Sequence, residues 1–452
     1  MVQSGDKLKI KIEDLAYGGD GVGHLPQGRV VFVPGSIPGE EVKIMLTKIK
    51  KNYARAKILQ VLSPSPARVE PRCQVYRDCG GCQLQHIEYR RQLKLKREIV
   101  AETLSRIGKL REVEIREVIP VEFPWLYRNH SQYPLKENSD GEIEAGFYKK
   151  GTHDVISSDN CEIQHPLINR VIRETLQLLN QYQITVYDEQ THSGLLRHLN
   201  VRVGVCTGQA VLTIVTLDKN FKSGPEVARK LRAKIPELTG VVQNINPGRT
   251  NVIRGERDIC LEGRMKISDY LGRIKYKISP ASFFQVNTLQ TEKLYQQIVS
   301  LADFRGQEVV VDCYSGLGSI ALYLANKVGQ VVGIEEVPAA VEDAEENKEI
   351  NNIKNCSFIC GQVEEELPHL QAKDINPDLV IVDPPRRGLK EETIETLKSL
   401  RADKLIYVSC NPTTLARDLK LLTDFYSLRL VQPVDMFPQT YHIENVTLLT
   451  GK

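Results

Sequence analysis

Apolar and polar residues alternate in short runs over the first sixty positions. KLKIKIEDL at residues 7–15 alternates strictly, RVVFVPGSIPGEEVKIMLTKI at 29–49 gives two further runs, and YARAKILQVL at 53–62 ends the set. The Gly-rich segment AYGGDGVGHL at 16–25 is interpreted as a turn. Several short strands at this spacing predict a small β-barrel over residues 1–60.

The pattern changes after residue 62. SPSPARVEP at 63–71 marks a boundary, because each of its prolines removes a donor from a strand ladder. Apolar residues then recur at helical spacing from His86 to Ile107, with basic residues between them. Residues 111–275 mix strand-like runs (LNVRVGV, AVLTIVTL, GVVQNIN) with helical ones (PLINRVIRETLQLLNQY, GPEVARKLRAKI). We therefore expect a central α+β domain over residues 61–275.

From about residue 276 onward, apolar strands and amphipathic helices alternate regularly. This rhythm is typical of a parallel sheet with helices on both faces, so residues 276–452 are expected to form a Rossmann-like domain. The predicted fold class is α/β, with a small N-terminal barrel and a central α+β domain preceding the Rossmann-like domain.

Composition and hydropathy exclude several classes of protein. The chain has 452 residues, 41% hydrophobic and 26% charged, which indicates a globular rather than a disordered protein. No run approaches the roughly 18–20 apolar residues of a membrane span, and the N-terminal residues lack the apolar stretch of a signal peptide. We expect a cytoplasmic protein that binds no membrane, in which the ten cysteines are reduced thiols or metal ligands.

Charge is distributed unevenly, although the net charge is only +3. Residues 1–60 carry ten Lys and Arg against six acids, and residues 71–110 carry nine against four. Residues 335–366 reverse this balance with ten acids against two bases, which we interpret as a solvated helix face. A basic first quarter joined to a more acidic region is typical of a nucleic-acid-binding part attached to a part with another task.

The segment EVVVDCYSGLGSIALYLA contains a strand, a glycine turn and a helix. Asp312 ends the strand, and Gly316 and Gly318 allow a ligand to approach the backbone. Glu335 ends the next strand, nineteen residues after Gly316, where an acid suits hydrogen bonding to ribose hydroxyls. The turn is not G-x-G-x-x-G, and no basic residue near it is placed to hold a pyrophosphate. A nucleoside without phosphates, such as S-adenosylmethionine, is favoured.

Three further segments place chemically active residues at strand ends. Asp383 follows the strand of DLVIVDPPRRG, and Cys410 follows the strand of KLIYVSCNP. Ligands bind at the carboxyl ends of strands in such sheets, so the Cys410 thiol is expected to face the site. His442 and Glu444 in MFPQTYHIENVTLL stand just before a terminal apolar strand.

Four cysteines have the spacing of a metal site. Cys73, Cys79 and Cys82 lie in C-x5-C-G-G-C, and Cys161 lies far downstream in NCEIQHP. Three thiols on a tight Gly-rich loop can converge on one metal centre, and a set of four thiolates suits either an iron–sulfur cluster or tetrahedral zinc.

Aromatic and basic residues are interleaved in three segments of the central domain, LYRNHSQY, GFYKKGTH and LRHLNVR. Such a mixture suits single-stranded RNA, whose bases stack on aromatic rings while cations hold the phosphates. The candidate RNA contacts are Arg128, Asn129, Arg197 and His198.

SFFQVN, DCYSGLG, DPPRRG, VSCNP and FPQTYHIE occur in this order, together with the four cysteines. Over essentially its whole length the chain resembles the RNA uracil-5 methyltransferase family, which uses S-adenosylmethionine and carries an N-terminal TRAM barrel. The resemblance implies that Cys410 is the nucleophile and Glu444 the general base. It also implies cofactor contacts from Gln285, Tyr314, Glu335 and Asp383, and a [4Fe–4S] cluster on Cys73, Cys79, Cys82 and Cys161.

The chemistry of uracil explains these residue types. C5 is a poor nucleophile until a thiolate adds to C6, and a base must later remove the C5 proton so that the thiol can leave. Because the thiolate is the attacking species, the surroundings of Cys410 are expected to lower its pKa.

The resulting prediction is an enzyme that makes 5-methyluridine in structured RNA, with 23S ribosomal RNA as the expected partner and no obligate protein partner. Transfer RNA is the alternative substrate, since the barrel and the cysteines resemble the ribosomal branch but the family contains both. Two other functions stay open: methylation of an exocyclic amine, which needs no cysteine nucleophile, and a non-catalytic RNA-binding assembly factor.

Overall fold

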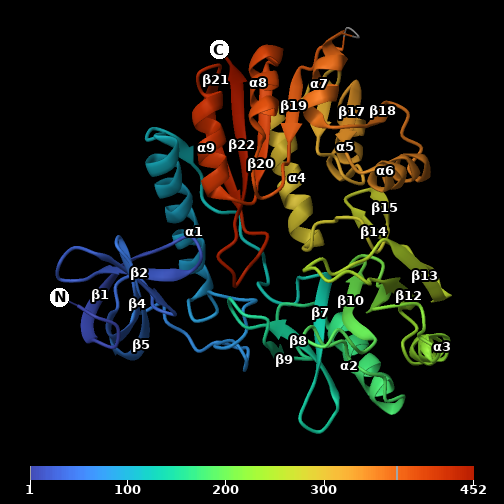
Figure 1. The fold of residues 1–452 in the computed structure, drawn as a ribbon. Coiled ribbons are helices and arrows are strands. Elements are labelled where there is room, and N and C mark those ends of the chain that lie inside the picture. Colours follow the sequence, from blue (N-terminus) through green and yellow to red (C-terminus); the bar gives the residue numbers. More distant parts are fainter. Residues whose placement is uncertain (1, 373–374) are drawn as a thin grey trace.

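The computed structural model describes residues 2–372 and 375–452, and it places the N-terminal barrel beside a helix that leads into the C-terminal sheet (Figure 1). The barrel strands are β1 (Lys7–Leu15), β2 (Asp20–His24), β3 (Val30–Pro34), β4 (Glu41–Ile49) and β5 (Tyr53–Ser63), closed in the order β1-β2-β3-β5-β4. Their alternate apolar side chains fill the interior of the barrel. The predicted barrel is confirmed.

One strand of the barrel lies where the sequence indicates only a turn. Gly18 and Gly19 have positive φ angles and form the turn, but β2 follows immediately and pairs with both β1 and β3. The glycines of β2 serve close packing: a Cβ on Gly23 would lie 2.6 Å from the Lys11 carbonyl oxygen, and one on Gly21 would meet Ser36. Glycine was therefore misinterpreted as a turn signal where it permits neighbouring backbones to approach.

The barrel is docked onto helix α1 (Tyr89–Thr103), which continues into a short π-helix at Leu104–Gly108. Leu15 and Ile37 of the barrel form a small apolar cluster with Leu84, Ile87 and Leu95. Helix α1 in turn packs against α9 (Pro412–Leu422) of the C-terminal domain. Apolar contacts thus connect the barrel through α1 to the domain at the other end of the chain.

The central sheet has the order β13-β12-β11-β10-β7-β8-β9. Its elements are β7 (His130–Glu137), β8 (Ile143–Tyr148), β9 (Val155–Ser157), α2 (Pro166–Gln181), β10 (Leu196–Val203), β11 (Ala210–Thr216), α3 (Gly224–Lys234), β12 (Leu238–Ile245) and β13 (Arg257–Gly263). Helices α2 and α3 share one apolar core with the sheet. The strands and helices expected between 111 and 263 are present.

The C-terminal sheet has the order β18-β17-β16-β19-β20-β22-β21-β6. Its strands are β6 (Glu114–Ile115), β16 (Val309–Cys313), β17 (Gln330–Glu335), β18 (Cys356–Cys360), β19 (Leu379–Val382), β20 (Lys404–Ser409), β21 (Tyr426–Val434) and β22 (Glu444–Gly451). The strands from β18 to β20 are parallel. Strand β22 runs antiparallel to both neighbours, so the expectation of a wholly parallel sheet is wrong at this edge.

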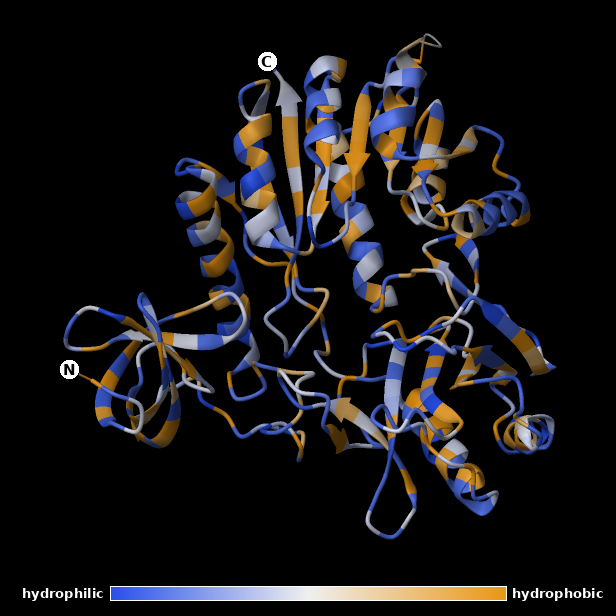
Figure 2. Ribbon diagram, viewed as in Figure 1, coloured by the Kyte–Doolittle hydropathy of each residue, from blue (hydrophilic) through white to orange (hydrophobic). Residues whose placement is uncertain are grey.

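Helices cover this sheet on both faces, as expected. They are α4 (Thr288–Ala302), α5 (Ser319–Leu324), α6 (Pro338–Ile350), α7 (Val363–Ala372), α8 (Glu391–Leu400) and α9, and the hairpin β14 (Ile267–Leu271) and β15 (Ile274–Ile278) leads into α4. Two apolar cores lie against the sheet. Figure 2 shows β19 apolar along its length, which is typical of a strand buried on both faces.

Strand β6 lies within the predicted central domain, residues 61–275, but belongs to the C-terminal sheet. It pairs with β21, and Ile119 forms a further bridge to Val434. This part of the predicted central domain therefore packs against the C-terminal domain. No helix in the described ranges is both long enough and apolar enough to cross a membrane.

Candidate active site

Cys410 and Glu444 come together because β22 runs antiparallel beside β20. Ser409, the last residue of β20, pairs with Asn445, so Cys410 and Glu444 are the next two residues along this register. Glu444 also pairs with Val434 of β21, which leaves its side chain 4% exposed, whereas Cys410 is half-buried. Asp383 follows the neighbouring parallel strand β19, at the same edge.

These three acidic groups perturb one another. Burial, Glu444 and Asp383 raise the pKa of Cys410 to about 12, while Arg386 acts in the opposite direction. Burial and Asp383 raise the pKa of Glu444 to about 8, and burial raises that of Asp383 to about 7. The expectation that the surroundings lower the pKa of Cys410 is therefore wrong, because a half-buried thiol lies here beside two carboxyl groups and one arginine.

The glycine turn after β16 is braced by acids. Glu335 accepts hydrogen bonds from the backbone N–H groups of Gly316 and Val337, at 2.9 Å each. The buried Asp312 accepts the N–H of Ala321 through Oδ2, and its Oδ1 has no hydrogen-bond partner in the structure. The turn thus presents an unpaired carboxylate oxygen and a second acid at the ends of adjacent strands.

Tyr314 and Gln285 complete the predicted cofactor set. Tyr314 follows β16 with φ of 64°, and its hydroxyl lies 3.4 Å from Thr393 Oγ1. Tyr314, Glu335 and Asp383 are thereby placed at the ends of the neighbouring strands β16, β17 and β19. Gln285 comes from the segment before α4 and lines a cavity of about 430 Å³.

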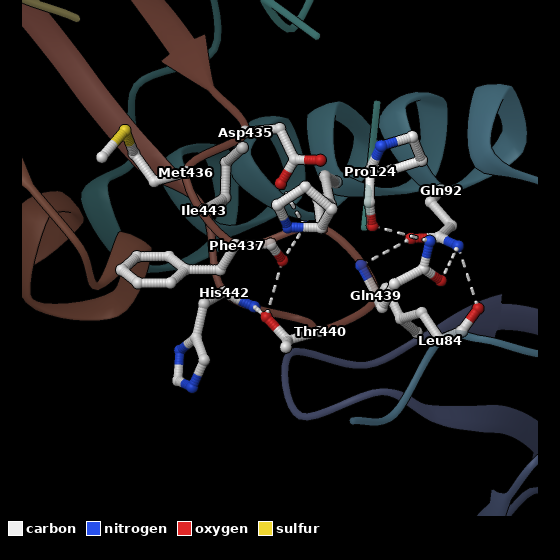
Figure 3. A network of polar contacts seen from close by, with 12 residues as sticks. Leu84, Gln92, Pro124, Asp435, Met436, Phe437, Gln439, Thr440, His442 and Ile443 are labelled. Atoms are coloured by element: carbon white, nitrogen blue, oxygen red, sulfur yellow. Dashed lines mark hydrogen bonds and ion pairs between the residues drawn. The ribbon is translucent and has the colours of Figure 1, made fainter. Parts of the chain in front are cut away.

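The loop 435–443 leads directly into Glu444 and is held by helix α1. Lys96 Nζ lies 2.6 Å from Asp435 Oδ1 and 3.1 Å from the carbonyl oxygen of Phe437, and neither charged side chain is exposed. Figure 3 shows Gln92 beside Gln439, whose Oε1 accepts a hydrogen bond of 3.0 Å from Gln92 Nε2. Sequence reasoning missed these residues.

The four cysteines predicted to bind a metal line the same cavity of about 430 Å³. An ion pair of 2.7 Å between Arg72 and Glu162 joins the two chain segments, each next to a cysteine. Gly80 presses against β8: a Cβ there would lie 2.8 Å from the Tyr148 carbonyl oxygen. Burial raises the pKa of Cys161 to about 12, with smaller contributions from Cys79 and Cys73.

Within the part of the chain that the structure describes, no group of three or more His, Cys, Asp or Glu side chains could hold a metal ion. Among these residues the geometry therefore supports neither the expected [4Fe–4S] cluster nor the zinc alternative.

The same cavity reaches the loop 435–443. It is also lined by Arg128, His130, Arg386, Phe437 and His442. Burial lowers the pKa of His442 to about 4, with Arg386 adding to the effect, so this imidazole is neutral near pH 7. The motif DPPRRG contains Arg386, but the sequence did not indicate that its charge acts on Cys410.

The candidate RNA-binding residues differ in how far the structure exposes them. Arg128 is half-buried and lines the cavity, with Nε bonded to the His130 carbonyl oxygen. Asn129 is 1% exposed, and its amide group donates to the Gln285 carbonyl and to Thr288 Oγ1. Asn129 therefore fastens the segment that carries Gln285 and offers no surface to RNA, contrary to expectation.

Arg197 and His198 are also largely buried. Arg197 donates to the carbonyl oxygens of Asn246 and Gly248 and lies 4.5 Å from the ring centre of Tyr187. Burial, with Arg197 adding to it, lowers the pKa of His198 to about 4. Both residues line a second cavity of about 450 Å³, so only their outer edges can meet a ligand.

The parallel strands β18 to β20, the glycine turn and the acids at the strand ends are features of the fold of S-adenosylmethionine-dependent methyltransferases. Residues 88–452 match the family model described as tRNA (Uracil-5-)-methyltransferase, and residues 2–59 match the TRAM domain. The chain belongs to this RNA uracil-5 methyltransferase family.

Relatives and solved structures agree with this membership. A protein of Halalkalibacterium halodurans, described as an uncharacterized RNA methyltransferase, is 42% identical over 100% of this chain and 98% of its own length. One of Listeria innocua with the same description is 44% identical over 100% and 99%. The crystal structure of Pyrococcus abyssi tRNA (uracil-54, C5)-methyltransferase with S-adenosyl-L-homocysteine has a TM-score of 0.77 and 29% identity, over 98% of this chain and 99% of that one.

Proposed function

We propose that this protein methylates C5 of uridine in 23S ribosomal RNA, with Cys410 as nucleophile and Glu444 as general base. One observation carries the proposal: the register of β20 and β22 makes Cys410 and Glu444 neighbours at the strand edge that Asp383 also occupies. A thiol and a carboxylate side by side suit addition to C6 and later removal of the C5 proton.

The bound cofactor supplies an electrophilic methyl group, and the chain's own residues control the protons. The thiol proton of Cys410 passes to the Asp383 carboxylate as Sγ bonds to C6, and the electron pair of the C5–C6 double bond moves to form an enolate. After C5 has accepted the methyl group, ionised Glu444 takes the C5 proton, the C6–S bond breaks with its electron pair returning to sulfur, and the thiolate takes back the proton from Asp383. Burial makes Glu444 a stronger base than an ordinary carboxylate, since it raises the pKa to about 8.

The two proposed catalytic residues are tested by substitution. Cys410→Ala is expected to bind RNA and form no 5-methyluridine. Glu444→Gln is expected to accumulate a covalent protein–RNA adduct, seen as a heat-stable shifted gel band, because methyl transfer precedes removal of the C5 proton. RNA containing 5-fluorouridine is expected to trap the wild-type enzyme in the same way. Methylation by Cys410→Ala would support the exocyclic-amine alternative instead.

The choice of ribosomal RNA rests on the resemblance of the barrel and the cysteine set to the ribosomal branch. The named substrate of the Pyrococcus abyssi enzyme favours transfer RNA as the second candidate. Unmodified transcripts of 23S ribosomal RNA and of transfer RNA, each incubated with enzyme and cofactor, separate the two when 5-methyluridine is mapped in both. Methylation of neither transcript, with no adduct, would support a non-catalytic RNA-binding factor.

We further propose that Gln285, Tyr314, Glu335 and Asp383 contact the cofactor. Support comes from the strand ends where the last three stand and from the two N–H groups through which Glu335 is held in place. Glu335→Ala is expected to weaken cofactor binding, measured by calorimetry with S-adenosylhomocysteine. Glu336→Ala, at the adjacent position outside the strand, is the matched control.

For Cys73, Cys79, Cys82 and Cys161 we propose a [4Fe–4S] cluster that organises the RNA-binding region and takes no part in the chemistry. That all four cysteines line one cavity supports this assignment. Protein purified without oxygen is expected to be brown and to contain about four irons per chain. Stoichiometric zinc without iron would overturn it.

A further inference from the structure

The turn between β1 and β2 carries a barrel residue to the catalytic centre. Tyr17 lies 393 positions before Cys410, yet its hydroxyl oxygen is 3.4 Å from the Cys410 carbonyl oxygen. The ring of Tyr17 also meets Tyr441 edge-on, with centres 5.2 Å apart and an angle of 87° between the planes. Tyr17 therefore touches both the segment of the nucleophile and the loop before the base.

The position of this turn is well determined by its own hydrogen bonds. The N–H of Ala16 donates to the Asp20 carbonyl, and the N–H of Gly19 donates to the Ala16 carbonyl. A Cβ on Gly19 would lie 2.8 Å from Gln83 Cβ, so the turn is pressed against the cysteine loop. With Leu15 packed against Leu84, the barrel has little freedom to move Tyr17 away.

Hydrogen bonds hold the segments on both sides of the contact. The backbone N–H groups of Gln83 and Leu84 donate to the carbonyl oxygen of Gln439, in the loop that ends at Glu444. On the other side, Asn411 Nδ2 donates to the Arg386 carbonyl and ties the turn after Cys410 to the motif that follows β19. The two segments that Tyr17 contacts, at Cys410 and at Tyr441, are thus each held by hydrogen bonds close to the contact.

The chemical surroundings keep the Tyr17 hydroxyl a donor. Burial, Tyr441 and Cys410 raise its pKa above the ordinary value, Glu444 adds to this, and Arg386 acts in the opposite direction. A protonated phenol can donate one hydrogen bond, and the Cys410 carbonyl is the acceptor found within reach.

We infer that Tyr17, a residue of the RNA-binding barrel, is a positioning residue for the nucleophile Cys410. Its hydroxyl holds the Cys410 carbonyl and its ring supports Tyr441, so docking of the barrel completes the catalytic centre. The inference rests on the proposed function, because Cys410 must be the nucleophile for its position to matter. A barrel in this role contributes to the chemical step as well as to RNA affinity.

Tyr17→Phe tests this, since it removes only the hydroxyl. A neutral hydrogen bond is worth about 1 kcal/mol, so the single-turnover rate of methylation is expected to fall about fivefold while RNA affinity stays within about twofold. The rate of adduct formation with 5-fluorouridine RNA is expected to fall equally, because addition by Cys410 precedes trapping. Tyr53→Phe removes a hydroxyl elsewhere on the barrel and is expected to leave both rates unchanged.

A second variant approaches the same contact indirectly. The Cβ added by Gly19→Ala would push the turn away from Gln83. We expect this variant to lower the single-turnover rate of methylation while RNA affinity again stays unchanged. Wild-type rates in Tyr17→Phe, or a loss confined to RNA affinity, would overturn the inference while leaving the proposed function intact. Failure of the wild-type enzyme to methylate RNA or form the adduct would instead overturn the proposed function, and this inference with it.

Discussion

Replacement of Lys96 by methionine is expected to destabilise the protein strongly. Lys96 and Asp435 form an ion pair of 2.6 Å in which neither side chain is exposed, and Tyr89 donates a further hydrogen bond of 2.9 Å to Asp435. Without the ammonium group, the Asp435 carboxylate would remain buried with only Tyr89 as a side-chain partner, and the Phe437 carbonyl would keep only the donors of Thr440. Breaking such a buried pair on one side costs about 3–5 kcal/mol of unfolding free energy.

The double variant Lys96→Met/Asp435→Leu separates stability from positioning. Replacing both charges by apolar residues of similar size is often neutral, so most of the unfolding free energy should return. The double variant still lacks the bonds to Phe437 and Tyr89, and we expect its methylation rate to remain below that of the wild type. Urea unfolding followed by circular dichroism measures the first quantity, and single-turnover kinetics measures the second.

An exposed ion pair on the same helix is the control. Arg91 and Glu98 are 3.0 Å apart but 30% and 49% exposed, so Arg91→Met should cost less than about 1 kcal/mol. A similarly small loss in Lys96→Met, or a double variant as unstable as the single one, would refute the reasoning that burial makes this pair important.

Three further predictions concern the site and the barrel. Because Glu444 must be ionised and its pKa is raised to about 8, kcat/KM should rise with pH through that region, and a flat profile between pH 6 and 9 would contradict the assignment. Gly318→Ala should lower both stability and affinity for S-adenosylhomocysteine, measured by thermal unfolding and calorimetry, since φ is +79° and the new Cβ would lie 2.6 Å from Phe358. Burial acts to raise the pKa of Glu40, but hydrogen bonds from Arg68 and two backbone N–H groups bring it below the ordinary 4.5. The stability that ionised Glu40 gains from Arg68 should be present above pH 4.5 and lost below it, as Glu40 takes up its proton. In Glu40→Gln, urea titrations should show a smaller loss of unfolding free energy at acid pH. An unchanged pH dependence would exclude Glu40 as the source of that loss.

Local pattern predicted the barrel, the βα rhythm of the C-terminal domain and two of the candidate site residues at strand ends. Alternation of period two in the barrel and the βα rhythm after residue 276 place apolar faces toward a core whatever lies opposite. The local pattern also places Asp383 and Cys410 at strand ends, because each parallel strand leads into its helix at the same edge of the sheet. Glycine was less informative, since Gly21 and Gly23 serve close packing inside β2.

Contacts between distant segments decided the rest. The local pattern does not show which edge of the sheet accepts β22, yet its antiparallel place beside β20 puts Glu444 next to Cys410, where it raises the pKa of the thiol. Lys96 stands three residues from Leu93 and from Ile99 on an apolar helix face, and only the fold supplies the buried Asp435 that pairs with it. From the sequence Tyr17 is only part of a turn, and its contacts to Cys410 and Tyr441 follow from the docking of the barrel. Periodicity specifies which face a side chain occupies, whereas partners hundreds of positions away are chosen by the packing of whole domains.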